Sequence, residues 1–203
     1  MGSFNATFVF AASFFTLAFA CLFLMIHFWG RKYFPAAEPM PRPRRIIYAA
    51  GLFFGSALYL LGQSLLENSQ GGSDGVILFW HRFQHSGLFM ALYFWPLLVA
   101  ETLTVRVPKW FRLLTGGLWA GLTAVTVAGP YFIGDTLHLL NNHVRQGREG
   151  LLYPVFQVWS LVMLLLIPAV LIRQLFRRLK GRGEGAWPTV AGGMIASMAA
   201  VFD

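Results

Sequence analysis

The chain alternates between long apolar stretches and short polar connections. A helix needs about 20 apolar residues to cross a bilayer core of roughly 30 Å. Five stretches meet this length and a sixth approaches it, and breaker residues occur in the connections between them. The pattern predicts one all-α domain over residues 1–203, a polytopic membrane helix bundle with about six transmembrane helices. The expected spans are 4–29, 46–66, 76–100, 113–133, 151–176 and 188–203.

The sixth stretch is the shortest of the set. Residues 188–203 would form only about 24 Å of helix before the sequence stops at Asp203. We therefore expect the native protein to continue beyond this point. A short, tilted final helix is the alternative interpretation.

Basic residues lie in three of the connections. All but three of the 16 Lys and Arg residues fall within 31–45, 101–112 and 173–182. The connections on the cytoplasmic side of a membrane protein carry an excess of Lys and Arg. This distribution predicts an amino terminus outside the cell and three basic connections in the cytoplasm.

The composition agrees with a chain surrounded by lipid. Hydrophobic residues make up 57% of the sequence and charged residues only 12%, whereas a soluble domain carries about 25% charged residues. The net charge of +8 does not indicate nucleic-acid binding, because the basic residues lie in short connections and not on one broad polar surface. Cys21, the single cysteine, lies in the first apolar stretch, so one chain cannot contain a disulfide or a cysteine-based metal site.

A polar cluster interrupts the third apolar stretch near its outer end. His81, Gln84 and His85 are three and four residues apart, so they share one face of a helix. Polar groups at such depth usually face the bundle interior or a wet cavity. One interpretation is a ligand pocket that opens to the outside, with Arg82 pairing an anionic group of a small-molecule or lipid-like ligand. The other is that Arg82 extends to the lipid headgroups and the histidines lie at the interface.

Further polar residues extend this hypothesis. Gln63 in the second span and Gln157 in the fifth are candidates for the same pocket. The long outer connection, residues 134–150, could form a lid over the pocket, or its helical-looking stretch at 137–140 could lie on the surface.

Histidines also allow a metal or haem hypothesis. His81 and His85 are one helical turn apart, and His138 and His143 in the outer connection could add ligands. A zinc site takes three or four protein ligands, and the cluster contains no carboxylate and no HExxH pattern. We therefore expect no metal and no cofactor.

Two spans carry glycines four residues apart, Gly51 with Gly55 and Gly117 with Gly121. Such pairs let two helix backbones approach closely in a membrane. The pattern indicates either packing inside one bundle or formation of a homodimer.

The third span also carries a family resemblance. Trp80, Arg82, Gln84 and Gly87 resemble the W-x-R-x-Q-x-x-G element of the amino-terminal seven-helix sensory region of bacterial histidine kinases. The same region precedes diguanylate cyclase modules. The resemblance implies a signal-input domain in the bacterial inner membrane, truncated before its seventh helix and output module, with no catalytic activity of its own. Two alternatives stay open: a small transporter or channel, and a membrane enzyme or haem protein that uses His81 and His85.

Overall fold

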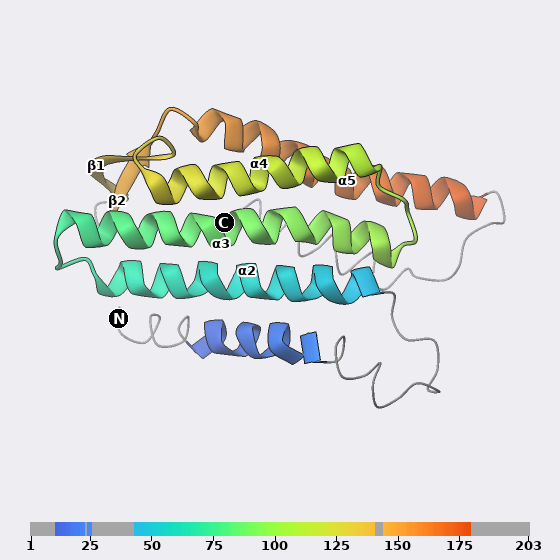
Figure 1. Ribbon diagram of the computed structural model, residues 1–203, viewed down its shortest axis with the longest axis horizontal. Helices are drawn as coiled ribbons and strands as arrows, with labels where there is room; N and C mark the ends of the chain where they lie inside the picture. Colours follow the sequence, from blue (N-terminus) through green and yellow to red (C-terminus); the bar gives the residue numbers. More distant parts are fainter. Residues whose placement is uncertain (1–10, 23, 26–42, 141–143, 180–203) are drawn as a thin grey trace.

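The computed structural model describes residues 11–22, 24–25, 43–140 and 144–179. Helices dominate this part of the chain, and Figure 1 shows them lying side by side along the long axis of the molecule. A short apolar helix, Ala11–Leu22, comes first. It is followed by α2 (Pro43–Asn68), α3 (Asp74–Thr102), α4 (Lys109–Ala128), β1 (Ile133–Leu140), β2 (Val144–Glu149) and α5 (Tyr153–Leu179).

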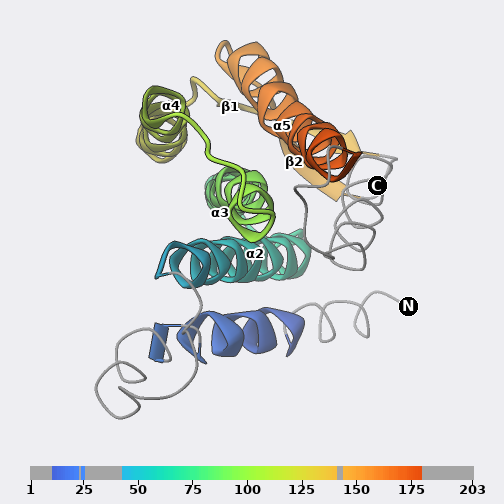
Figure 2. The same cartoon turned by 90° about the vertical axis from the view of Figure 1, so that its right-hand side faces the viewer.

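Helix α3 occupies the centre of the bundle. It contacts α2, α4, α5 and both strands, and the end-on view in Figure 2 places it between α2 and the α4–α5 pair. The short helix Ala11–Leu22 lies against the outer side of α2, where Phe19 and Phe53 stack with ring centroids 5.6 Å apart. Since every other described element packs on α2 or α3, these two helices form the frame of the fold.

The helices α2, α3, α4 and α5 are each long and apolar enough to cross a membrane. Their outward faces carry large apolar side chains: Leu113 of α4 is 76% exposed, and Val158 of α5 is 64% exposed. An apolar surface of this extent is suited to lipid or another apolar partner and not to water. The predicted second, third and fifth spans therefore correspond to helices, and the sixth lies outside the described residues.

The structure differs from the expected all-α chain at one end of the bundle. The fourth helix ends at Ala128 and not at residue 133, and the connection that follows contains an antiparallel two-stranded hairpin. Gly129 and Pro130 end the helix, since both residues disfavour helical continuation. The stretch 137–140, which looked helical, belongs to strand β1.

The hairpin has one irregularity. Leu137 pairs with Gly147 and His138 with Gln146, but the register shifts between Leu137 and Ile133, which pairs with Glu149. Two backbone hydrogen bonds join the segment before β1 to the segment between β2 and α5. The N–H of Gly150 donates to the carbonyl oxygen of Phe132 (2.7 Å), and the N–H of Leu152 donates to that of Tyr131 (2.8 Å). The hairpin is thus held to the ends of α4 and α5.

Glycines bring α2 and α3 into close contact. A Cβ atom added at Gly87 would meet the backbone nitrogen of Tyr59 at 2.4 Å, and one added at Gly55 would meet the nitrogen of Ala91 at 2.6 Å. A Cβ at Gly62 would meet the Cα of Gln84 at 2.7 Å. Only glycine therefore allows these two backbones to lie so close. The Gly51–Gly55 pair accordingly serves packing inside the bundle.

The second glycine pair has a different environment. Among the described residues, nothing lies within 4 Å of a Cβ built at Gly117 or Gly121. Both glycines lie on the outward side of α4 and are exposed. Neither packs against another described helix.

An aromatic cluster fills the space between α3, α4, α5 and the start of β1. Phe89, Phe132 and Met163 are completely buried there. Phe89 and Phe132 meet edge to face with their centroids 4.9 Å apart, and Trp159 lies against Phe89. This cluster is the core on which the hairpin end of the bundle rests.

We predict that Gly87→Ala lowers the free energy of unfolding by about 1–3 kcal/mol, since the added methyl group meets backbone atoms that can move only if the helices separate. Thermal unfolding in mild detergent measures the effect. Gly117→Ala is the matched control and should leave stability unchanged or raise it by less than about 1 kcal/mol through better helix propensity. Equal stability of the two variants would show that close packing of α2 on α3 is not a source of stability.

Candidate functional site

The polar residues of α3 gather on one face, as their spacing predicts. His81 and Gln84 are each only 6% exposed, and His85 is partly buried on the same side of the helix. The rings of His81 and His85 meet edge to face with their centroids 4.7 Å apart. The face is turned toward α2 and the hairpin, so these groups lie inside the molecule.

Hydrogen bonds determine which nitrogen of each histidine carries the proton. The backbone N–H of Gly147 in β2 donates to His81 Nδ1 at 3.1 Å. His81 Nδ1 is therefore unprotonated and the proton lies on Nε2. His85 Nδ1 lies 2.9 Å from the carbonyl oxygen of His81, to which it must donate. The free Nε2 of His85 is consequently an acceptor.

Neither Nε2 has a hydrogen-bond partner in the described part of the chain. His81 thus presents a donor and His85 an acceptor, one helical turn apart. A bound molecule that contains both an acceptor and a donor could engage both rings at once. This pairing of opposite hydrogen-bonding roles is the main chemical feature of the site.

A chain of amides joins α3 to α2 beside the histidines. Gln84 Nε2 donates to Gln63 Oε1 at 2.6 Å, and Gln63 Nε2 donates to Glu67 Oε1 at 2.7 Å. The close approach at Gly62 makes the first of these bonds possible, since Gln84 lies directly against that glycine. Gln84 Oε1 is buried and has no partner among the described residues. The amide pair therefore stays oriented and keeps an unused acceptor.

These residues line a cavity of about 1030 Å³ at the hairpin end of the bundle. Four elements besides α3 contribute to its wall: α2, the two strands of the hairpin, and α5 through its first residue. The lining residues are Tyr59, Gln63, Leu66, His81, Gln84, His85, Leu88, Ile133, His138, Gln146, Gly147, Arg148, Glu149 and Tyr153. Such a volume suits a small organic molecule.

The charges on the cavity wall balance. Among the described lining residues, Arg148 and Glu149 carry a formal charge, and both are exposed on β2. His81 is neutral in the arrangement that its hydrogen bond requires. The described part of the wall is therefore polar, with one formal charge of each sign.

Arg82 has a structural role that the sequence did not indicate. Its guanidinium donates to the carbonyl oxygen of Ile133 at 3.0 Å and pairs with the carboxylate of Asp135 at 2.7 Å. Both partners belong to the irregular section of β1. Arg82 does not line the cavity; it holds the first strand on α3.

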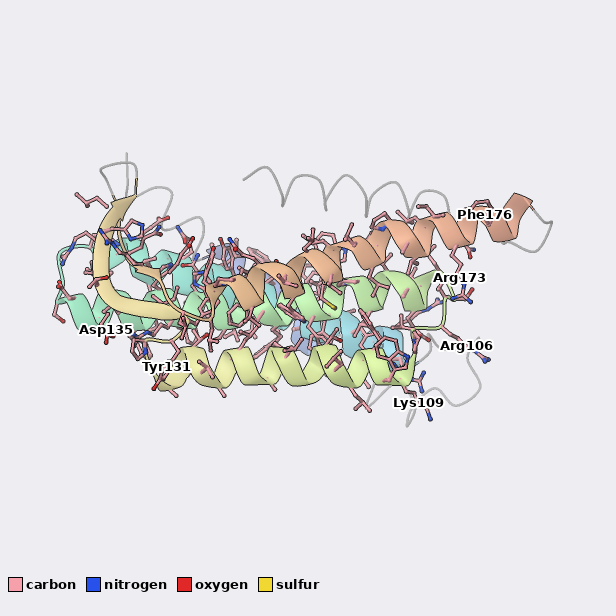
Figure 3. All side chains as sticks on the ribbon, turned by 90° about the horizontal axis from the view of Figure 1, so that it is seen from above. Arg106, Lys109, Tyr131, Asp135, Arg173 and Phe176 are labelled. Carbon is pink, nitrogen blue, oxygen red and sulfur yellow. The ribbon has the colours of Figure 1, made fainter. Side chains whose placement is uncertain are left out.

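A second set of bonds holds the other strand. The side chain of Gln70, in the turn after α2, accepts from the backbone N–H of Arg145 at 2.6 Å and donates to its carbonyl oxygen at 3.2 Å. The guanidinium of Arg145 also pairs with Asp74, at the start of α3. The hairpin is thus attached to the α2–α3 turn at β2 and to α3 at β1. Figure 3 shows Asp135 at this end of the molecule.

The structure brings together some of the sequence candidates and separates others. His81, Gln84, His85 and Gln63 line one cavity. Gln157 lies exposed on α5 and is not part of it. The outer connection, which the sequence suggested as a lid, forms the hairpin and supplies six of the described lining residues.

His138 joins the cavity wall, and its buried Nδ1 has no partner among the described residues. His143 lies outside the described residues. Within the described ranges, no group of three or more His, Cys, Asp or Glu side chains could hold a metal ion. The histidine constellation suggested for a metal is therefore not assembled by that part of the chain.

Sequence reasoning missed Tyr59, Gln146 and Gln70. Tyr59 lies on α2, one helical turn before Gln63, so helical spacing could have placed it beside that residue. Gln146 and Gln70 carry no such signal, since their positions depend on the hairpin fold.

No protein-family model, curated protein or solved structure matches this chain. The description of the protein therefore rests on its geometry: a helical bundle with membrane-spanning dimensions and a polar cavity under a β-hairpin at one end.

We predict that Arg82→Ala accelerates backbone hydrogen exchange in the hairpin by about tenfold, because β1 loses an ion pair and a hydrogen bond to a charged donor. Exchange followed by mass spectrometry over 133–149 measures the change. Asp135→Asn should have a smaller effect, since the carboxylate is exposed and the bond to Ile133 remains. Arg106→Ala, at the far end of the bundle, serves as the control. Unchanged exchange in Arg82→Ala would mean that this arginine does not hold the strand.

Proposed function

We propose that this chain is a membrane-embedded signal-input domain, which binds a small polar molecule in the cavity beneath the hairpin. The observation that carries the proposal is the pair of histidines whose free Nε2 atoms offer one donor and one acceptor to the cavity. Two further atoms of the cavity wall, Gln84 Oε1 and His138 Nδ1, are buried and have no partner among the described residues. Such groups cost free energy until a ligand or water satisfies them, so a ligand that bonds to them would offset this cost.

The ligand expected from the cavity wall is neutral or zwitterionic. Arg148 and Glu149, the charged groups among the described lining residues, are consecutive in β2, where they suit a molecule that carries both signs of charge. Arg82, the anion partner suggested by the sequence, is already paired with Asp135. A strongly anionic ligand would therefore find little compensation here.

The proposed orientation places the hairpin end outside the cell and the opposite end in the cytoplasm. The connection between α3 and α4 and the carboxyl-terminal part of α5 are basic and lie away from the hairpin, as Figure 3 shows for Arg106, Lys109 and Arg173. The positive-inside tendency of membrane proteins supports this orientation. Six spans, an amino terminus outside and insertion in a bacterial inner membrane all belong to the proposal.

Signalling fits the geometry better than transport. The aromatic cluster lies along α3 below the cavity, with Phe89 completely buried immediately after the lining residue Leu88. A transport path would have to cross this packed cluster. A bound molecule could instead act by moving the hairpin and α5 relative to α3, because Tyr153 of α5 contributes to the cavity wall.

The resemblance of Trp80–Gly87 to the sensory region of histidine kinases supports the same function. In the proposed protein, the cytoplasmic output would come from a kinase or cyclase module that follows this domain. The chain itself would catalyse no reaction. The bilayer and a second copy of the chain are its other proposed partners.

We predict that a compound from a panel of amino acids, dipeptides, nucleobases and monosaccharides raises the unfolding temperature of the detergent-solubilised chain in a saturable manner. Gln84→Leu should abolish the shift, because it removes the amide that orients the cavity wall. Gln157→Leu is a matched control, since that glutamine is exposed outside the cavity, and should keep the shift. Stabilisation that survives Gln84→Leu would place the binding site elsewhere.

We predict that Ser73→Cys reacts with a membrane-impermeant maleimide on intact cells, whereas Lys109→Cys reacts only after lysis. Both are made in a Cys21→Ser background, which removes the only native cysteine. Ser73 and Lys109 are exposed, and they lie at opposite ends of the bundle at the starts of α3 and α4. The reverse labelling pattern would invert the proposed topology, and labelling of both on intact cells would exclude a bilayer between them.

A further inference from the structure

A second cavity lies at the end of the bundle opposite the hairpin. It has a volume of about 490 Å³ and is formed where α2 begins, α3 ends and α4 begins. Within the part of the chain that the structure describes, five basic side chains line it: Arg44, Arg106, Lys109, Arg112 and Arg173. Figure 3 shows Arg106, Lys109 and Arg173, from three different elements, gathered at this end of the molecule.

The bundle determines the position of these basic groups. Arg112 donates from Nη1 to the hydroxyl of Tyr48 at 3.3 Å, and its buried Nε has no partner among the described residues. Arg106 lies in the turn between α3 and α4, directly after Val105, which is only 5% exposed. The neighbouring Arg45 uses its guanidinium for other hydrogen bonds. It donates to the carbonyl oxygens of Glu101 (3.1 Å) and Thr102 (3.2 Å) at the end of α3.

The wall of this cavity carries an excess of positive charge. Among the described residues that line it, Glu101 is the one carboxylate, against five basic groups. Like charges around a confined space repel each other, and a bound anion would offset that repulsion. Guanidinium groups match the oxygens of phosphate in geometry, and four of the five basic residues are arginines.

We propose that this cavity binds a phosphate group, supplied either by the headgroup of an anionic lipid or by a free phosphate compound. The proposal is independent of the ligand proposed for the hairpin cavity, because the two cavities share no lining residue. It also differs from a general attraction of basic residues to membranes, since it requires particular arginines around one cavity.

A phosphate group bound in this cavity would link α5 to the rest of the bundle. Near this end α5 packs through Val170 against Ala100, Leu103 and Val105. Arg173 follows Val170 by one helical turn and lies on the cavity wall. An anion held between Arg173 and Arg112 would join α5 to α4 at a point beyond that small apolar contact.

The test is the thermal stability of the full chain in a non-ionic detergent, with two probes. The first is pyrophosphate, titrated at ionic strength matched with sodium chloride. The second is phosphatidylglycerol added to the micelles, with phosphatidylcholine as the neutral comparison. We expect saturable stabilisation by at least one probe.

Arg173→Gln and Arg106→Gln should each weaken the apparent affinity about tenfold, because each removes a charged donor to the anion. Ser73→Asp is the control, since it lowers the net charge by the same one unit at the opposite end of the molecule, at an exposed position that lines neither cavity, and should change nothing. Both test residues are exposed, so their substitution should leave the fold intact.

The two probes distinguish the source of the phosphate. A response to pyrophosphate alone identifies a free phosphate compound, and a response to phosphatidylglycerol alone identifies a lipid headgroup. The proposal is overturned if neither probe gives saturable stabilisation. It is also overturned if Ser73→Asp weakens the response as much as Arg173→Gln, which would indicate a general electrostatic effect.

Discussion

Two apolar helices surrounded by lipid gain little from hiding leucine side chains against each other, because the lipid tails are equally apolar. Close backbone contact is therefore the constraint on which this structure depends. At Gly55, Gly62 and Gly87, α2 and α3 approach so closely that any Cβ atom would collide with the facing helix. That approach brings Gln63 within 2.6 Å of Gln84 and gives the cavity its wall. Packing and the candidate site thus have a common origin.

The hairpin supplies a hydrogen-bond partner for a polar side chain that the helices bury. Placing His81 inside the bundle leaves a polar ring that needs a partner, and β2 supplies one through the backbone N–H of Gly147. The hairpin in turn is held by Arg82, Gln70 and Arg145, whose bonds reach α3 and the α2–α3 turn. Each of these bonds is modest by itself. Together they keep a two-stranded element, which is only marginally stable alone, in one place over the cavity.

The local parts of this structure could be predicted from the sequence, and the long-range parts could not. Hydrophobic length located α2, α3 and α5 to within a few residues, and helical spacing placed His81, Gln84 and His85 on one face. The hairpin was missed because residues 133–149 contain no clear alternation of polar and apolar positions. The sequence offered Arg82 either a ligand or the lipid headgroups, and it missed the actual partner, Asp135, because that residue lies 53 positions away. Nothing in the neighbourhood of either residue indicates that pairing.

Helix α3 contributes to the walls of both cavities, so it limits how binding at one could affect the other. Leu88 lines one cavity and Leu97 the other, about 13 Å apart along the same helix. Between them the helix is packed against the buried ring of Phe89 and its neighbours, which cannot be compressed without strain. A molecule bound at one end can therefore affect the other end only by shifting whole helices. Helix α5 is the element suited to that shift, since it borders both cavities through Tyr153 and Arg173 but contacts α4 only sparsely.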